Sequence, residues 1–153
     1  MVAQLGFAQR VNNDLTVEKS VAELGAELAA GNTTSERLVR SYLSRIDALD
    51  RKGPAIRAVI AINPDALKIA RELDRERKLK GARGPMHGIP VLLKDNIETL
   101  DAMPTTAGSL ALVENFAGRD APIVANLRAA GAIILGKTNL SEWANFRSER
   151  SIS

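Results

Sequence analysis

Three short apolar runs, separated by amphipathic helical patterns, set the strongest limit on how this chain can fold. The runs are Arg57–Ile62, Ile89–Lys94 and Ala132–Leu135. They show almost no polar alternation, which is typical of strands covered on both faces. The predicted order is helix, helix, strand, helix, strand, loop, helix, strand. This order predicts an α/β fold whose sheet is at least partly parallel.

Two helices are predicted ahead of the first strand, as a helical hairpin over about residues 17–50. The first runs from about Val17 to Ala30. The second begins after Thr33, because Thr33 and Glu36 have the spacing of a capping box. Gly53-Pro54 ends the hairpin, since this dipeptide favours a turn.

The α/β portion is predicted over about residues 57–145 and contains two more helices. One runs from about Pro64 to Lys80, with Asn63 as a suitable N-cap. The other begins near Asp120 and is ended by Gly131. Three of its apolar residues are expected to face the core: Ile123, Val124 and Leu127.

The composition excludes several classes of function. The 153 residues include no cysteine and one histidine, His87, which excludes disulfides and thiolate or histidine-cluster metal sites. The net charge is 21 − 18 = +3, and basic residues concentrate in Lys68–Arg83. With only 3% aromatic residues, we interpret this segment as a solvated helix face and expect no nucleic-acid partner. No secretory signal or membrane-spanning run is visible, so a cytoplasmic protein without membrane contact is expected.

The segment Gly131–Thr138 satisfies the phosphate-loop pattern G-x-x-x-x-G-K-[ST]. A phosphate loop has a strand before its first glycine and a helix directly after the Lys-Thr pair. Here a predicted helix precedes Gly131, and the four residues between the glycines are typical of a strand. We therefore interpret the match as accidental.

Lys94, at the end of the predicted strand Ile89–Lys94, is a candidate catalytic base. Open α/β sheets place ligand sites outside the carboxyl ends of their strands. Removal from water there would favour the neutral amine, which is the form that accepts a proton. Asp95 would oppose this effect, but neighbours on a strand point to opposite faces. The alternative is a strand-end lysine whose ammonium group stays in water, and spacing alone leaves both open.

Several segments, in the same order and spacing, resemble the amidase signature family. The resemblance extends from about Thr16 to the C-terminus, and its motifs are Gly84–Asn96, Thr105–Ser109, Leu127-Arg128, Ala130–Ala132, Gly136–Ala144 and Asn145–Ser148. The last of these is similar to the subgroup that contains peptide amidases and their bacterial and plant relatives. The resemblance implies the N-terminal portion of an α/β/α sandwich with a mixed, partly parallel sheet.

The family resemblance also implies an activity, the hydrolysis of linear amides (R-CO-NH2 + H2O to R-COOH + NH3) without metal or cofactor. The family uses a triad of serine, cis-serine and lysine, and its lysine carries over to Lys94. This lysine takes a proton through the bridging serine while the nucleophilic serine attacks. Both serines, and the N–H groups of the oxyanion hole, belong to a Gly/Ser-rich segment downstream of the last motif. Lys94 is thus the only triad member in this sequence.

Because the sequence has the lysine of the family's triad but neither serine, we expect an N-terminal fragment of a single amidase domain. We expect this fragment to be inactive alone and prone to self-association. Ser148, Ser151 and Ser153 lack flanking glycines, and we assign them no catalytic role. The expected partner of the full-length enzyme is a small-molecule or peptide amide. The competing hypothesis is a non-catalytic α/β binding module derived from an amidase.

The remaining polar candidates are given supporting roles. His87 has no nucleophile motif beside it and is interpreted as structural. Lys137 and Asn139 end a predicted strand and are expected to pack or to hydrogen-bond loops. The resemblance places three loop residues near the catalytic centre: Thr105, Thr106 and Ser109.

Overall fold

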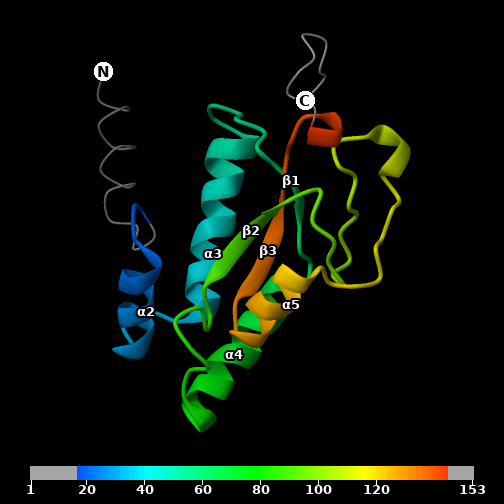
Figure 1. Cartoon of the computed structure of the whole chain (residues 1–153). Coiled ribbons are helices and arrows are strands. Elements are labelled where there is room, and N and C mark those ends of the chain that lie inside the picture. The colour runs from blue at the N-terminus through cyan, green and yellow to red at the C-terminus, as the bar shows by residue number, and fades with distance from the viewer. Residues whose placement is uncertain (1–16, 145–153) are drawn as a thin grey trace, which may run out of the picture.

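The computed structural model describes residues 17–144, which form a three-stranded sheet between helices (Figure 1). In chain order the elements are α2 (Val21–Ala29), α3 (Ser35–Arg45), the π-helical segment η1 (Ile46–Arg51), β1 (Val59–Ile62), α4 (Ala66–Lys80), β2 (Pro90–Lys94), the 3-10 turn η2 (Leu110–Leu112), α5 (Pro122–Ala129), β3 (Ile133–Thr138) and the 3-10 turn η3 (Glu142–Ala144). The motif Asn145–Ser148 and the serines Ser148, Ser151 and Ser153 lie outside the described residues.

The sheet is mixed and has the strand order β1-β3-β2. The central strand β3 pairs in parallel with β2 and antiparallel with β1. The parallel pair requires a long crossover, which the loop after β2 and helix α5 provide. The predicted α/β fold with a partly parallel sheet is therefore confirmed.

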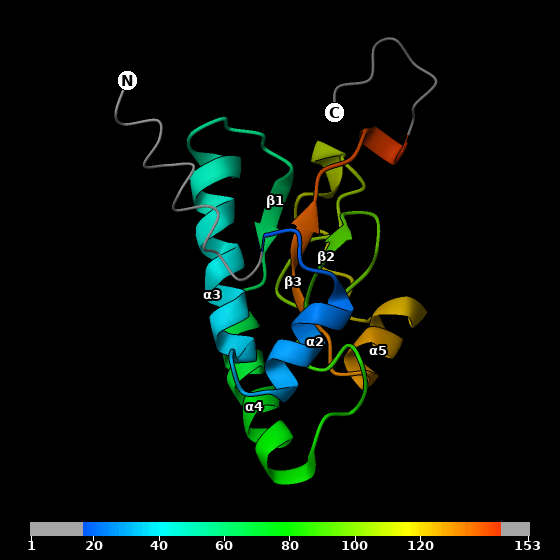
Figure 2. The same ribbon diagram turned by 90° about the vertical axis from the view of Figure 1, so that its left-hand side faces the viewer.

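Helices cover both faces of the sheet, as Figure 2 shows, and the result is three layers. Helices α3 and α4 pack on one face, around a buried cluster of Val39, Ala66, Ala70, Leu73, Ile133 and Leu135. Helix α5 packs on the opposite face, around Leu93, Met103, Val124 and Ile134. Strands with apolar residues on both sides need this double cover, because each face would otherwise remain in water.

The start of α3 differs from the prediction by one residue. The N-cap is Thr34, and Thr33 is buried, so the predicted capping box of Thr33 and Glu36 is wrong. Thr34 Oγ1 accepts from the Arg37 N–H at 3.1 Å, and Asp74 of α4 adds a second acceptor: its carboxylate accepts from the N–H groups of Ser35 (2.8 Å) and Glu36 (3.0 Å). A residue 39 positions away thus satisfies the first turn, which local spacing does not indicate.

Strand β3 is longer than predicted, since it continues past Leu135 to Thr138. Gly136 makes this continuation possible. A Cβ atom at this position would overlap the carbonyl oxygen of Ala61 on β1, so only glycine allows the two strands to approach this closely. Lys137, which we expected to follow the strand, consequently lies within it.

The exposure of helix α5 also differs from the prediction. Val124 is fully buried, but Ile123 is 56% exposed rather than inward-facing. Helix α5 has eight residues and meets the sheet along one narrow face, which leaves Ile123 on its outer side.

Across residues 17–144, no helix combines the length and apolar character needed to cross a membrane.

Candidate active site

Lys94 is the last residue of β2, at the carboxyl edge of the parallel β2–β3 pair. Its Nζ donates to the backbone carbonyl of Asn139, just beyond β3, at 2.7 Å. The side chain is exposed, which is the alternative to removal from water that the sequence left open. Strand β2 is an edge strand of the described sheet, so a neighbouring strand lies on one side of it only. Lys94 thus occupies the edge at which α/β sheets bind ligands, in an accessible position.

Asp95 follows Lys94, and its side chain is fully buried. The two neighbouring side chains therefore lie in different environments, Lys94 exposed and Asp95 buried. The Asp95 carboxylate accepts from the Thr106 hydroxyl and from the Thr106 N–H at 3.1 Å. The backbone carbonyl of Asp95 accepts from the Ala107 N–H at 3.1 Å. Asp95 therefore fixes the return of the loop that begins directly after Lys94.

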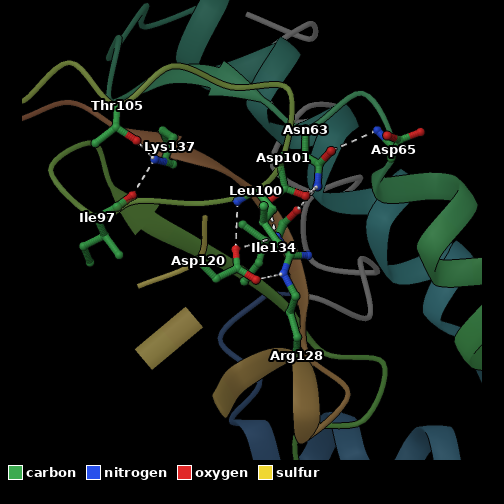
Figure 3. A network of polar contacts seen from close by, with 10 residues as sticks. All are labelled: Asn63, Asp65, Ile97, Leu100, Asp101, Thr105, Asp120, Arg128, Ile134 and Lys137. Carbon is green, nitrogen blue, oxygen red and sulfur yellow. Dashed lines mark hydrogen bonds and ion pairs between the residues drawn. The ribbon is translucent and has the colours of Figure 1, made fainter. Parts of the chain in front are cut away.

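Lys137 is fully buried, in contrast to Lys94. Its Nζ donates to the carbonyl oxygen of Ile97 at 2.6 Å and to Oγ1 of Thr105 at 3.0 Å (Figure 3). Burial lowers the pKa of Lys137 from its ordinary value of 10.5, although the carboxylate of Asp95 acts in the opposite direction. The predicted role of Lys137 in loop hydrogen bonding is confirmed.

The phosphate-loop pattern does not have phosphate-loop geometry. Helix α5 ends before Gly131, and Gly136-Lys137-Thr138 lie within strand β3. The Lys137 ammonium group, which would bind phosphate in such a loop, is buried against protein acceptors. The interpretation of the match as accidental is confirmed by this order of elements.

His87 is fully buried between α4 and the chain entering β2. Its Nε2 lies 3.0 Å from the carbonyl oxygen of Leu73, and its Nδ1 accepts from the N–H of Arg83 at 3.2 Å. Because Nδ1 accepts from a backbone N–H, Nε2 is the ring nitrogen that donates to the Leu73 carbonyl. Both ring nitrogens are occupied by backbone groups, so the structural interpretation of His87 is supported.

A polar network centred on Arg128 joins α5 to the loop after β2 (Figure 3). Arg128 pairs with Asp101 and donates to Asp120 at 2.8 Å. Burial acts to raise the pKa of Asp120, but hydrogen bonds from Arg128 and from the Leu100 N–H outweigh it and hold that pKa below its ordinary 3.8. The sequence analysis did not identify this network, because Asp120 and Asp101 lie 8 and 27 residues from Arg128 and the three residues match no known motif spacing.

Asn63 extends this network to β1. Its side-chain amide donates to Asp101 and to the carbonyl oxygen of Ile134, each at 2.8 Å. Its own Oδ1 accepts from the Asp65 N–H at 3.0 Å. Among residues 17–144, there is no group of three or more His, Cys, Asp or Glu side chains arranged to hold a metal ion. The Asp101 carboxylate, which bonds to Asn63 and Arg128, ties the loop after β2 to the end of β1 and to α5.

Comparison with known proteins identifies relatives along nearly the whole chain. The Amidase family model matches residues 37–152. The Probable amidase of Arabidopsis thaliana is 43% identical over 153 residues, an alignment that covers 97% of this chain and 29% of the relative. A glutamyl-tRNA(Gln) amidotransferase subunit of Acidothermus cellulolyticus is 39% identical over 129 residues, covering 84% of this chain and 25% of the relative.

Solved structures give the same result. The native peptide amidase from Stenotrophomonas maltophilia has 57% sequence identity and a TM-score of 0.85, over 91% of this chain and 28% of that chain. An amidase family protein from Bacillus anthracis has 40% identity and a TM-score of 0.85, over 92% of this chain and 28% of that one. The chain thus spans less than a third of the length of these relatives. Because the family model matches most of the sequence and the described fold superposes on these enzymes, the chain belongs to the amidase family.

Proposed function

We propose that residues 17–144 form the lysine-bearing part of an amide-hydrolysing site, with Lys94 as its catalytic base. The observation that carries this proposal is the position of Lys94 at the carboxyl edge of the β2–β3 pair, with an accessible side chain. Membership of the amidase family supports the reaction class. The buried Lys137 has no access to a substrate, which favours Lys94 over the other strand-end lysine.

The proposed chemistry is proton transfer through two serines, in the manner that the family resemblance implies. The neutral Lys94 amine accepts a proton from the bridging serine, which in turn accepts the proton of the nucleophilic serine. The nucleophilic oxygen forms a bond to the amide carbon. The C–N bond then breaks as the proton is returned to the departing nitrogen, and water releases the acid from the acyl-enzyme.

Lys94 by itself is insufficient for this reaction. A lysine base requires an environment that favours the neutral amine, whereas the Lys94 side chain here is exposed and its Nζ donates to the Asn139 carbonyl. The sequence contains no Gly/Ser-rich segment of the kind that carries both serines in the family. We therefore propose that these 153 residues are inactive alone, and that the serines and the cover over Lys94 belong to further amidase sequence.

A segment exchange tests the assignment. Residues 17–144 replace the aligned segment of the Stenotrophomonas maltophilia peptide amidase, which has 57% identity to this chain. The hybrid is expected to release ammonia from a panel of primary amides that includes peptide amides. Loss of activity in Lys94→Ala, with activity retained in the matched surface variant Lys80→Ala, supports Lys94 as the base. A folded hybrid without activity would contradict the proposed function.

The chain alone provides the second test. Ammonia release from the same amides is expected to equal that of a heat-treated control. Turnover that is abolished by Lys94→Ala would show that the 153 residues contain a complete site, and would overturn the proposed division of the triad. A folded, inactive chain that also fails to support the hybrid favours the binding-module alternative.

A further inference from the structure

The proposed function gives no part in the reaction to Lys137, whose side chain is buried. Lys137 is the largest of the fully buried side chains among residues 17–144. An ammonium group loses its hydration when buried, and this cost is repaid only by well-placed acceptors. The acceptors here are the Ile97 carbonyl and the Thr105 hydroxyl, and both lie on the loop that follows Lys94 (Figure 3).

An irregularity in the sheet directs Lys137 toward this loop. In the parallel pair, Val91 lies opposite Ile134, but Leu92 lies opposite Gly136, so β3 contains one extra residue. Strict alternation from Ile134 would send Lys137 to the α3–α4 face, together with Leu135. The shift instead places Lys137 opposite Leu93, whose side chain lies on the α5 face. A bulge of this kind redirects a side chain, and such bulges are frequent beside active sites.

The loop that Lys137 holds is closed by contacts at several points. Its first residue, Asp95, binds Thr106 through its carboxylate and Thr138 of β3 through its N–H (3.1 Å). The returning half of the loop contacts the segment after β3, where the Trp143 N–H donates to the Ala107 carbonyl at 2.7 Å. Lys137 binds both halves of the loop, through Ile97 on the outgoing half and Thr105 on the returning half.

Lys94 depends on the two segments that Lys137 joins. It directly precedes the loop, and its Nζ donates to the carbonyl of Asn139, two residues after Lys137. We propose that Lys137 is a positioning residue for Lys94: its buried ammonium group ties the loop after β2 to strand β3 and thereby holds Lys94 at the sheet edge. This inference rests on the proposed function for its catalytic consequence, whereas the anchoring itself is testable without activity.

The anchoring is tested in the 153-residue chain by backbone hydrogen exchange. Lys137→Met keeps the length of the side chain and removes its donors. The N–H groups of Thr106 and Ala107 are expected to exchange about tenfold faster, because a hydrogen bond to a charged group is lost. The N–H of Leu24 in α2, remote from the loop, serves as the internal control. Unchanged exchange at Thr106 and Ala107 would overturn the inference.

The catalytic consequence is tested in the hybrid enzyme by steady-state kinetics. Lys137→Met is expected to lower kcat about tenfold, with KM changed by less than about twofold, since a misplaced base slows the reaction without weakening substrate binding. Equal kcat in the variant and the unsubstituted hybrid would overturn the positioning role.

A pair of variants at Thr105 covers the case in which Lys137→Met fails to fold. Thr105→Val removes the hydroxyl acceptor at nearly constant shape, and Thr105→Ser restores it. Thr105→Val is expected to lower kcat severalfold, and Thr105→Ser is expected to recover it. Equal kcat in these two variants would contradict the inference. If the unsubstituted hybrid is inactive, the proposed function fails, and the exchange rates alone decide the anchoring.

Discussion

Lys94 and Lys137 lie on paired strands, one residue pair apart, in opposite environments. Leu93 is opposite Lys137, and Lys94 is opposite Thr138. The Lys94 side chain is exposed and bonds to one carbonyl, whereas Lys137 is fully buried and bonds to two groups of a loop. The comparison shows that a strand-end position does not by itself determine the environment of a lysine. The environment of each lysine is determined by the register between β2 and β3 and by the length of β3.

The largest effect is expected when Lys94 is replaced. In the hybrid enzyme, Lys94→Ala should lower kcat about a thousandfold or more, because proton transfer is lost. In the 153-residue chain, where the Lys94 side chain is exposed, the same substitution should change the unfolding free energy by less than about 0.5 kcal/mol. Kinetics of the hybrid and urea unfolding of the 153-residue chain measure the two quantities. Equal kinetic effects of Lys94→Ala and Lys137→Ala would mean that the base is wrongly assigned.

The second expected effect concerns the glycine next to Lys137. Gly136→Ala should lower the unfolding free energy by about 1–3 kcal/mol, because the added methyl group overlaps the Ala61 carbonyl and forces β1 away from β3. Gly84→Ala is the matched control, since a Cβ atom there meets no atom within 4 Å. Urea midpoints followed by far-UV circular dichroism provide the measurement. Equal midpoints for the two variants would show that close strand approach at Gly136 is not required.

A third prediction concerns the exposed apolar side chains on and beside the two edge strands. Ile56, Ile60 and Leu92 are 65%, 44% and 38% exposed, and β2 and β1 are both edge strands. Unpaired edges and exposed apolar groups promote association, so the 153-residue chain is expected to self-associate. Leu92→Lys should weaken association about tenfold.

Size-exclusion chromatography with light scattering measures this association, and the near-UV circular dichroism of Trp143 and Tyr42 reports side-chain order. A sharp monomer peak with a strong near-UV signal and a cooperative thermal transition would contradict the prediction. That result would favour the independent binding module over the fragment of an amidase domain.

The smallest effect is expected in the pH dependence of stability, which distinguishes Lys137 from an exposed lysine. Burial lowers the pKa of Lys137 below 10.5, the ordinary value that applies in the unfolded chain. Between these two values the unfolded chain binds more protons than the folded one, so the unfolding free energy rises with pH. The rise cannot exceed about 1.4 kcal/mol per pH unit.

Lys137→Met removes this titration and serves as the reference. The stability of the unsubstituted chain relative to Lys137→Met is therefore expected to increase between pH 7 and pH 10, as measured by urea midpoints at both pH values. A constant or decreasing difference would show that Lys137 is not desolvated in the folded chain.

Local patterns were sufficient to predict the order of the elements and a sheet that is at least partly parallel. Apolar periodicity and the Gly and Pro residues act within a few positions along the chain, so they are readable without a structure. The position of Lys94 at the end of β2 and the family membership also followed from the sequence. The same signals located each element to within a few residues, but they did not indicate how far β3 continues.

Only the tertiary structure decided what surrounds each candidate residue. The acceptors of Lys137 lie 40 and 32 residues away, and the carboxylate that caps α3 comes from α4. The contacts of Lys137 depend on the one-residue shift between β2 and β3, which no local pattern records. Burial of Lys137 and exposure of Lys94 follow from that register and from the edge position of β2. Long-range pairing therefore determined which lysine is inside, because desolvation depends on three-dimensional neighbours rather than on sequence neighbours.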